Sequence, residues 1–137
     1  MGFLRFIAVI AFLCFLALPS PADEIGASDQ EVRLKAEPVL DNIFDGLKAN
    51  SYSIYLKDFD ETLKESISET KFLQTSQWVK DFIGTCSSRE YLGFLKKGKM
   101  TVILWKAKCD KSEDDVLIRL VMTKRGDSYL VAGIWFQ

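Results

Sequence analysis

The chain has 137 residues, with 18 basic and 19 acidic side chains and no histidine. This length suits one domain with a modest core, and the near balance of charge lacks the basic excess of nucleic-acid-binding surfaces. The absence of histidine excludes serine–histidine and cysteine–histidine nucleophiles and histidine zinc sites, so neither a metal nor another cofactor is expected.

The first 22 residues have the pattern of a secretory signal peptide. Arg5 supplies a positive start, residues 6–18 are apolar, and small residues at positions −3 and −1 precede Asp23. The apolar run is shorter than the roughly 20 residues that span a bilayer. Cys14 lies within it, behind residues too bulky for a lipoprotein cysteine. We therefore expect cleavage after Ala22 and a secreted or periplasmic domain without a membrane anchor.

A first helix is predicted from Ser28 onward. Ser28 and Glu31 have the spacing of a capping box, and apolar residues then recur at helical spacing up to Leu47, before a natural end at Asn50. Pro38 falls within this pattern, so either the helix bends there or a second helix begins with proline in its first turn.

More helical segments are predicted before the chain changes character. Apolar spacing indicates a short helix from Tyr52 and another that begins near Asp60. A further helix is expected between Glu69 and Ile83, ended by Gly84. Its inward residues are predicted to be Phe72, Val79, Phe82 and Ile83.

The second half of the chain is typical of β-structure. Residues 100–109, 116–123 and 129–136 are rich in β-branched and apolar side chains, and turn-forming residues separate them. Helices followed by a meander predict an α+β domain with helices on one face of an antiparallel sheet of about four strands. Residues 23–36 would be a leader and the start of the first helix, and 37–137 a single domain.

A hairpin turn at Lys97 and Gly98 would place the two remaining cysteines opposite each other. In that register Phe94 faces Thr101, Leu92 faces Ile103, Glu90 faces Trp105, and Cys86 faces Cys109. Opposed residues have Cα atoms about 4.5 or 5.5 Å apart, within the range of a disulfide, and a secreted chain favours pairing. We expect a structural Cys86–Cys109 disulfide; the alternative is two buried thiols that pack as small apolar residues.

The same register divides the side chains between the two faces of the sheet. Glu90 and Trp105 fall on an apolar face that should receive the helices, whereas Arg89 and Tyr91 fall on the opposite face. The last strand is apolar on both faces, so either it is central and covered twice or one face awaits a partner. A homodimer through the outer face would explain this pattern, with Trp135 as the interface candidate.

Several stretches resemble a known family. They are residues 46–52 with 55–61, residues 104–108 with 114–118, and residues 131–136. Together they are similar to an uncharacterised family of exported bacterial proteins with nuclear-transport-factor-like domains, over nearly the whole mature chain. The resemblance implies a cone of helices wrapped by a curved antiparallel sheet, often with a pocket at its mouth. The wider superfamily includes isomerases, dehydratases and binding proteins, so the fold does not define the activity.

The candidate pocket residues are Tyr52, Tyr55, Asp58, Glu90 and Trp105. A buried carboxylate beside a phenol could transfer protons. Alternatively, Asp58 or Asp60 caps the next helix while the tyrosines lie at the edge of the core. The pattern favours a module that binds a small apolar ligand or a protein partner, and no catalytic residue is assigned. A small isomerase- or hydrolase-type enzyme using Asp/Glu and Tyr, and a purely structural homodimer, remain alternatives.

Overall fold

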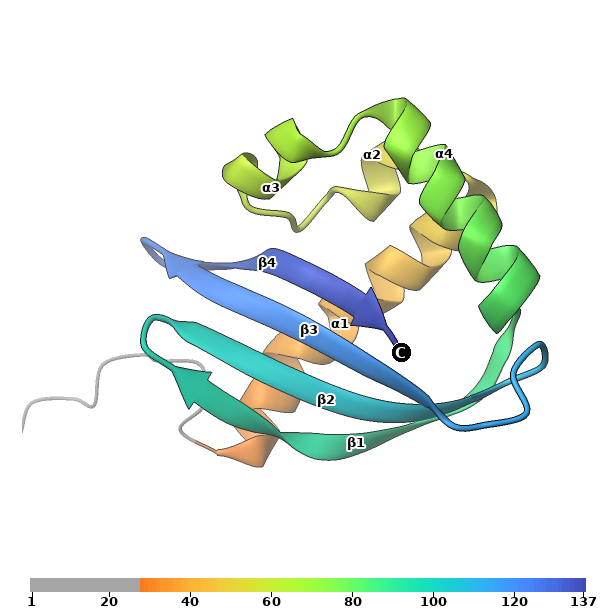
Figure 1. Cartoon of the computed structure of the whole chain (residues 1–137). Coiled ribbons are helices and arrows are strands. Elements are labelled where there is room, and N and C mark those ends of the chain that lie inside the picture. The colour runs from red at the N-terminus through yellow and green to blue at the C-terminus, as the bar shows by residue number, and fades with distance from the viewer. Residues whose placement is uncertain (1–27) are drawn as a thin grey trace, which may run out of the picture.

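The computed structural model describes residues 28–137, as helices followed by one antiparallel sheet (Figure 1). The predicted signal peptide and its cleavage site lie outside the described residues. The helices are α1 (Asp29–Ala49), α2 (Tyr52–Tyr55), α3 (Glu61–Ser66) and α4 (Glu69–Trp78), which continues as the π-helical segment η1 (Val79–Ile83). The strands β1 (Cys86–Lys97), β2 (Met100–Cys109), β3 (Val116–Arg125) and β4 (Ser128–Phe136) pair in sequence order. The predicted α+β class is confirmed.

Helix α1 is one continuous helix that crosses one face of the sheet (Figure 1). The Ser28 side chain accepts a hydrogen bond from the Glu31 backbone N–H at 3.2 Å, as the predicted cap requires. Pro38 removes the backbone bond to the carbonyl of Leu34, but Leu34 is 69% exposed, so water can satisfy that carbonyl. Its buried stripe consists of Val32, Ala36, Val39, Leu40, Ile43 and Leu47.

Helix α2 packs directly against the end of α1. A Cβ atom on Gly46 would lie 2.5 Å from the backbone nitrogen of Tyr55, so this close approach requires glycine. The Ser51 N–H also donates to the Gly46 carbonyl at 2.8 Å. This contact sets the position of Tyr55, whose side chain is 5% exposed.

The last turn of the α4 helix widens into a π-helix. The Gly84 N–H donates to the Val79 carbonyl five residues earlier, and Gly84 ends the segment with a φ of 75°. Phe72, Val79 and Ile83 are buried as predicted. Phe82 was predicted to point inward and is 61% exposed, because the wider turn shifts the residues after Val79 away from regular helical spacing.

The β1–β2 hairpin turns at Gly98 and Lys99, one residue later than predicted. Phe94 therefore pairs with Ile103, Tyr91 with Trp105, and Glu90 with Lys106. Two register shifts, at Ser87 and at Leu92, then return the ladder so that Cys86 still pairs with Cys109. The cysteine pairing was correct although the intermediate register was wrong, because the displaced turn and the two bulges compensate each other.

The corrected register changes which β1 side chains face the helices. Arg89 and Tyr91 point toward α1, whereas Glu90 is on the outer face. Trp105 is fully buried on the inner face and pairs with Ile118. A β2–β3 turn at residues 111–114 would instead pair Trp105 with a residue of β3 two positions later in the sequence. A shift of two residues preserves the side of the sheet, so the predicted inner residues of β2 and β3 are confirmed as core.

Strand β4 lies at an edge of the sheet and is not a central strand. A register shift at Ala132 breaks its alternation, which explains why its sequence is apolar on both faces. Val131 is fully buried, whereas Trp135 is 41% exposed. The other side of β4 is partly covered by the segment before α3. The Val131 N–H donates to the Asp58 carbonyl at 2.7 Å, and the Asp60 N–H donates to the Val131 carbonyl at 2.8 Å.

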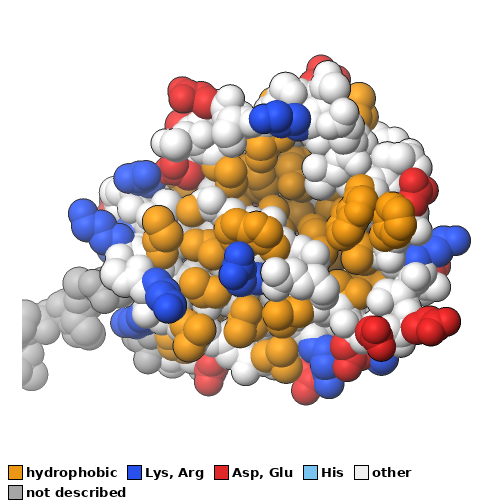
Figure 2. Space-filling view, in the orientation of Figure 1, with side chains coloured by type: hydrophobic (Ala, Val, Ile, Leu, Met, Phe, Trp, Pro, Cys, Tyr) orange, Lys and Arg blue, Asp and Glu red, His pale blue; other side chains and the backbone are white. Residues whose placement is uncertain are grey.

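The outer face of the sheet is largely apolar. Figure 2 shows orange side chains spread over the sheet, with isolated basic groups among them. They include the half-buried Val102, Leu104 and Val121 and the exposed Leu95 and Trp135. Among the helices in residues 28–137, none combines the length and apolarity needed to span a bilayer.

Candidate functional site

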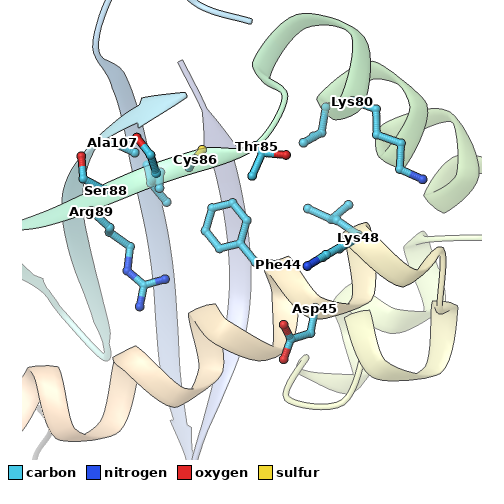
Figure 3. A pocket seen from close by; sticks show the side chains of 13 residues that line it. Phe44, Asp45, Lys48, Lys80, Thr85, Cys86, Ser88, Arg89 and Ala107 are labelled. Atoms are coloured by element: carbon cyan, nitrogen blue, oxygen red, sulfur yellow. The ribbon is translucent and has the colours of Figure 1, made fainter. Parts of the chain in front are cut away.

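A pocket of about 430 Å³ lies between the second half of α1, the segment η1 and the start of β1 (Figure 3). We call it the α1–β1 pocket. Its apolar walls are formed by Phe44, Leu47, Val79, Ala107 and Ile118. Its remaining lining is polar or charged and includes Lys48, Thr85 and Arg89. A space with apolar walls and a few polar groups is the usual form of a small-molecule site.

The disulfide between Cys86 and Cys109 fixes one wall of the pocket. It joins the first residue of β1 to the last residue of β2, where their Cα atoms are 3.8 Å apart, closer than in a regular antiparallel ladder. Next to it, the Thr85 N–H donates to the Asp110 carboxylate at 2.8 Å. These two links hold the chain as it passes from η1 into β1, so the wall opposite Phe44 has a defined position (Figure 3).

Arg89 closes one end of the pocket as part of an ion-pair network with α1. Its guanidinium lies 2.5 Å from the Glu37 carboxylate and 2.8 Å from the Asp41 carboxylate. Burial lowers the pKa of Arg89, but the hydrogen bonds to Asp41 and Glu37 outweigh this effect and raise the pKa above its ordinary value. The positive charge of Arg89 is therefore neutralised by the carboxylates of Glu37 and Asp41.

Lys48 is the cation whose charge remains available to a ligand. Its amino group is turned toward Phe44, whereas the carboxylate of Asp45 points away from the pocket (Figure 3). Neither side chain forms an ion pair or a hydrogen bond with another residue in the described part of the chain. Lys80, on the opposite wall, donates to the Asn50 side chain at 2.7 Å. The pocket thus combines apolar walls with one unpaired ammonium group.

The tyrosines proposed from the sequence lie between α2 and α4, outside the α1–β1 pocket. The Tyr52 hydroxyl donates to the Ile67 carbonyl, and the rings of Tyr52 and Tyr55 both pack on Phe72. Burial raises the pKa of Tyr55 to about 12. Asp58 accepts a hydrogen bond from the Asn42 side chain at 2.7 Å. The contacts of Tyr52 and Tyr55 therefore fit the alternative to the proton-transfer hypothesis, in which the tyrosines lie at the edge of the core.

Trp105 and Glu90, predicted to face each other, lie on opposite sides of the sheet. The Trp105 indole N–H donates to the Glu37 carboxylate at 2.9 Å beneath α1. Glu90 is exposed and forms an ion pair with Lys106 at 3.1 Å. The prediction that Glu90 shares the apolar face of the sheet with Trp105 was wrong, because the register shift at Leu92 reverses its side of the strand.

Sequence reasoning missed the residues that line the α1–β1 pocket. Phe44 was included only in the helical pattern, and Lys48 looks like any lysine in the last turn of a helix. The one available signal was the pair Glu37 and Asp41, which are four residues apart on α1 and both contact Arg89 on the inner face of the sheet. In residues 28–137, no group of three or more acidic or cysteine side chains is arranged to hold a metal ion.

No protein-family model matches this chain, and no curated protein matches it. Among solved structures, it is similar to the solution structure of a SEC-C motif containing protein from Rhodopseudomonas palustris. The sequence identity is 9% and the TM-score is 0.47, over 76% of this chain and 90% of that chain. At this level of similarity neither residues nor activity can be transferred.

Proposed function

We propose that this chain is an exported binding module whose α1–β1 pocket takes a small, largely apolar ligand that carries one negative group. The observation that carries the proposal is the unpaired ammonium of Lys48 beside Phe44, above apolar walls. Burial of the ligand's apolar part would supply most of the affinity, and the charge would orient it. The Cys86–Cys109 disulfide supports an extracellular or periplasmic setting.

The resemblance to nuclear-transport-factor-like domains agrees with this proposal. Helices that precede four antiparallel strands, with α1 across one face, suit a cone whose interior offers a ligand site. We keep membership of that exported family as part of the proposal. The enzymatic alternative has less support, because the Tyr52 hydroxyl is bonded to a carbonyl and the high pKa of Tyr55 disfavours proton transfer near neutral pH.

A fluorescence titration with 1-anilinonaphthalene-8-sulfonate tests the site, since this probe joins apolar rings to one sulfonate. Lys48→Gln should weaken binding about fivefold through loss of one charge-assisted contact. Thr85→Trp should abolish binding, because Thr85 faces Phe44 across the pocket and a larger side chain would fill it (Figure 3). Lys57→Gln is the matched control, because Lys57 is an exposed lysine outside the pocket lining.

Near-ultraviolet circular dichroism must show that each variant keeps its tertiary packing, because the probe also binds partly unfolded protein. Native protein that gives no fluorescence increase would overturn the proposal. So would equal affinities for the unaltered protein, Lys48→Gln and Thr85→Trp.

Self-association through the outer sheet face is a second candidate function. It is favoured by the exposure of Leu95 and Trp135 on a face that also carries Val102, Leu104 and Val121. A contiguous apolar surface of this kind usually marks an interface.

A further inference from the structure

Arg119 lies on the outer face of the sheet among apolar side chains. It is on β3, where it pairs with Leu104 of β2 on one side and with Trp135 of β4 on the other. In the next row of the ladder on the same face, Val102 pairs with Val121. Figure 2 shows basic groups set among apolar side chains over the sheet. The register of the strands therefore surrounds one guanidinium group with apolar residues.

Trp135 holds the guanidinium group in place. The Cζ atom of Arg119 lies 4.3 Å from the centre of the Trp135 ring, which is a cation–π contact. A Cβ atom at Gly133 would lie 2.1 Å from this ring, so the ring occupies space that only glycine leaves open. A guanidinium group stacked on a ring uses its face and keeps the N–H donors in its plane for other acceptors. Arg119 is thus positioned without using its hydrogen-bond donors.

These donors have no acceptor in the described part of the chain. The Arg119 side chain forms neither a hydrogen bond nor an ion pair with another residue among 28–137. Its Nε is also shielded from solvent. Shielded polar groups nearly always have a partner, because an unsatisfied donor is costly. Arg119 as a whole is only half-buried, so the outer face is open to an acceptor from another molecule.

The carboxylates that contact the outer face are already paired. Glu90 forms an ion pair with Lys106 at 3.1 Å, and Asp115 forms one with Lys108 at 2.7 Å. The charge that remains without a counterion among the apolar residues is therefore positive and belongs to Arg119. A complementary surface has to supply a carboxylate as well as apolar area.

A second copy of this chain meets only one of these two requirements. It would bring a matching apolar face, but also a second unpaired Arg119 and only carboxylates that already have partners. Self-association through the outer face would therefore bury apolar area and leave the guanidinium groups without acceptors. A partner of different sequence can satisfy the apolar area and the charge together.

We propose that the outer sheet face binds a segment of a second protein in which apolar side chains surround one aspartate or glutamate, and that Arg119 pairs with its carboxylate. A guanidinium group can donate two parallel hydrogen bonds to a carboxylate, which gives direction as well as attraction. Leu95 and Trp135, both exposed, supply apolar contact area around this pair. Such a partner should displace a second copy from the same face.

A phage-displayed library of random dodecapeptides, selected on the disulfide-bonded protein, tests the proposal. Recovered peptides should carry an acidic residue among apolar ones, and fluorescence anisotropy then measures their affinities. Arg119→Gln should weaken binding about tenfold, and so should replacement of the acidic residue of the peptide by its amide. Both changes together should also weaken binding about tenfold, not about a hundredfold, because they remove the same pair.

Two further variants separate this pair from a general effect of charge. Arg33→Gln is the matched control, because Arg33 also lies on an aromatic ring, 5.3 Å from the centre of Tyr91, but on the side of α1. It should leave peptide binding unchanged. Arg119→Lys keeps the charge without the planar fork and should weaken binding less than Arg119→Gln. Near-ultraviolet circular dichroism checks that each variant keeps its tertiary packing.

The inference is overturned if the selection yields no peptide whose affinity falls with Arg119→Gln. It is also overturned if the effects of Arg119→Gln and of the peptide amide multiply, because the two groups then do not pair. Equal losses for Arg33→Gln and Arg119→Gln would reject it as well. Arg119 does not line the α1–β1 pocket, so either proposal can fail without the other.

Discussion

The carboxylate of Glu37 accepts a hydrogen bond from the indole N–H of Trp105 at 2.9 Å, in the layer between α1 and the sheet. The same carboxylate accepts from Arg89 at 2.5 Å. One side chain on α1 therefore satisfies a fully buried tryptophan on β2 and a half-buried arginine on β1. This contact fixes how the first helix lies across the strands.

Glu37→Ala should lower the free energy of unfolding by about 2 kcal/mol, because it leaves the buried Trp105 N–H and the Arg89 guanidinium without their shared acceptor. Urea unfolding monitored by tryptophan fluorescence measures this change. Glu113→Ala, in an exposed turn, is the control and should change the unfolding free energy by less than about 0.5 kcal/mol. Equal effects of the two substitutions would contradict the structural role of Glu37.

The Cys86–Cys109 disulfide closes a short loop, with a sequence separation of 23. Cys86→Ala with Cys109→Ala should therefore lower the free energy of unfolding by about 3 kcal/mol in the chain-entropy model. Peptide mapping without reductant should recover the two cysteines in one linked pair. Two alkylatable thiols in protein purified from an oxidising compartment would exclude the bond.

Asp60 makes stability depend on pH in the acidic range. A hydrogen bond from Arg125 is the main cause that holds the pKa of Asp60 below its ordinary value of 3.8. At pH values between the lowered pKa and 3.8, the unfolded chain binds more protons than the folded chain. The stabilisation of the fold by ionised Asp60 is therefore present above pH 3.8 and is lost as the pH falls through the pKa of Asp60 in the folded state.

Asp60→Asn should therefore reduce the acid-dependent loss of stability. The test compares urea midpoints of the variant and the unaltered protein at a series of acidic pH values. Asp127→Asn, in the neighbouring β3–β4 turn, is the control and should keep the pH dependence of the unaltered protein. Identical pH profiles for Asp60→Asn and the unaltered protein would refute the assigned role.

Trp135→Glu tests self-association through the outer sheet face. The Trp135 ring lies 4.3 Å from the Arg119 guanidinium and is 41% exposed, so a charged replacement should disrupt an interface while the fold is retained. Sedimentation at micromolar concentration should show a dimer that becomes a monomer. Trp78→Glu, at a tryptophan on α4 that is 44% exposed, should leave the dimer intact. Unaltered protein that is monomeric under these conditions rules out this interface.

Local patterns predicted the elements well where short-range chemistry decides them. The cap at Ser28, the end at Asn50 and the stop at Gly84 depend on backbone groups a few residues away, which the sequence displays directly. The side of the sheet for β2 and β3 was also correct, because alternation survives a shift of two residues. The π-helical turn that exposes Phe82 leaves no comparable signal in the residue pattern.

The sequence by itself determined the α+β class and the order of helices and strands. Only the tertiary structure decided the two bulges of β1 that bring Cys86 opposite Cys109, the placement of Glu90 outside and Arg89 inside, and the residues that line the α1–β1 pocket. The reason is physical: hydrophobic periodicity is a property of neighbouring residues, whereas bulges and pockets arise from packing between elements distant in sequence.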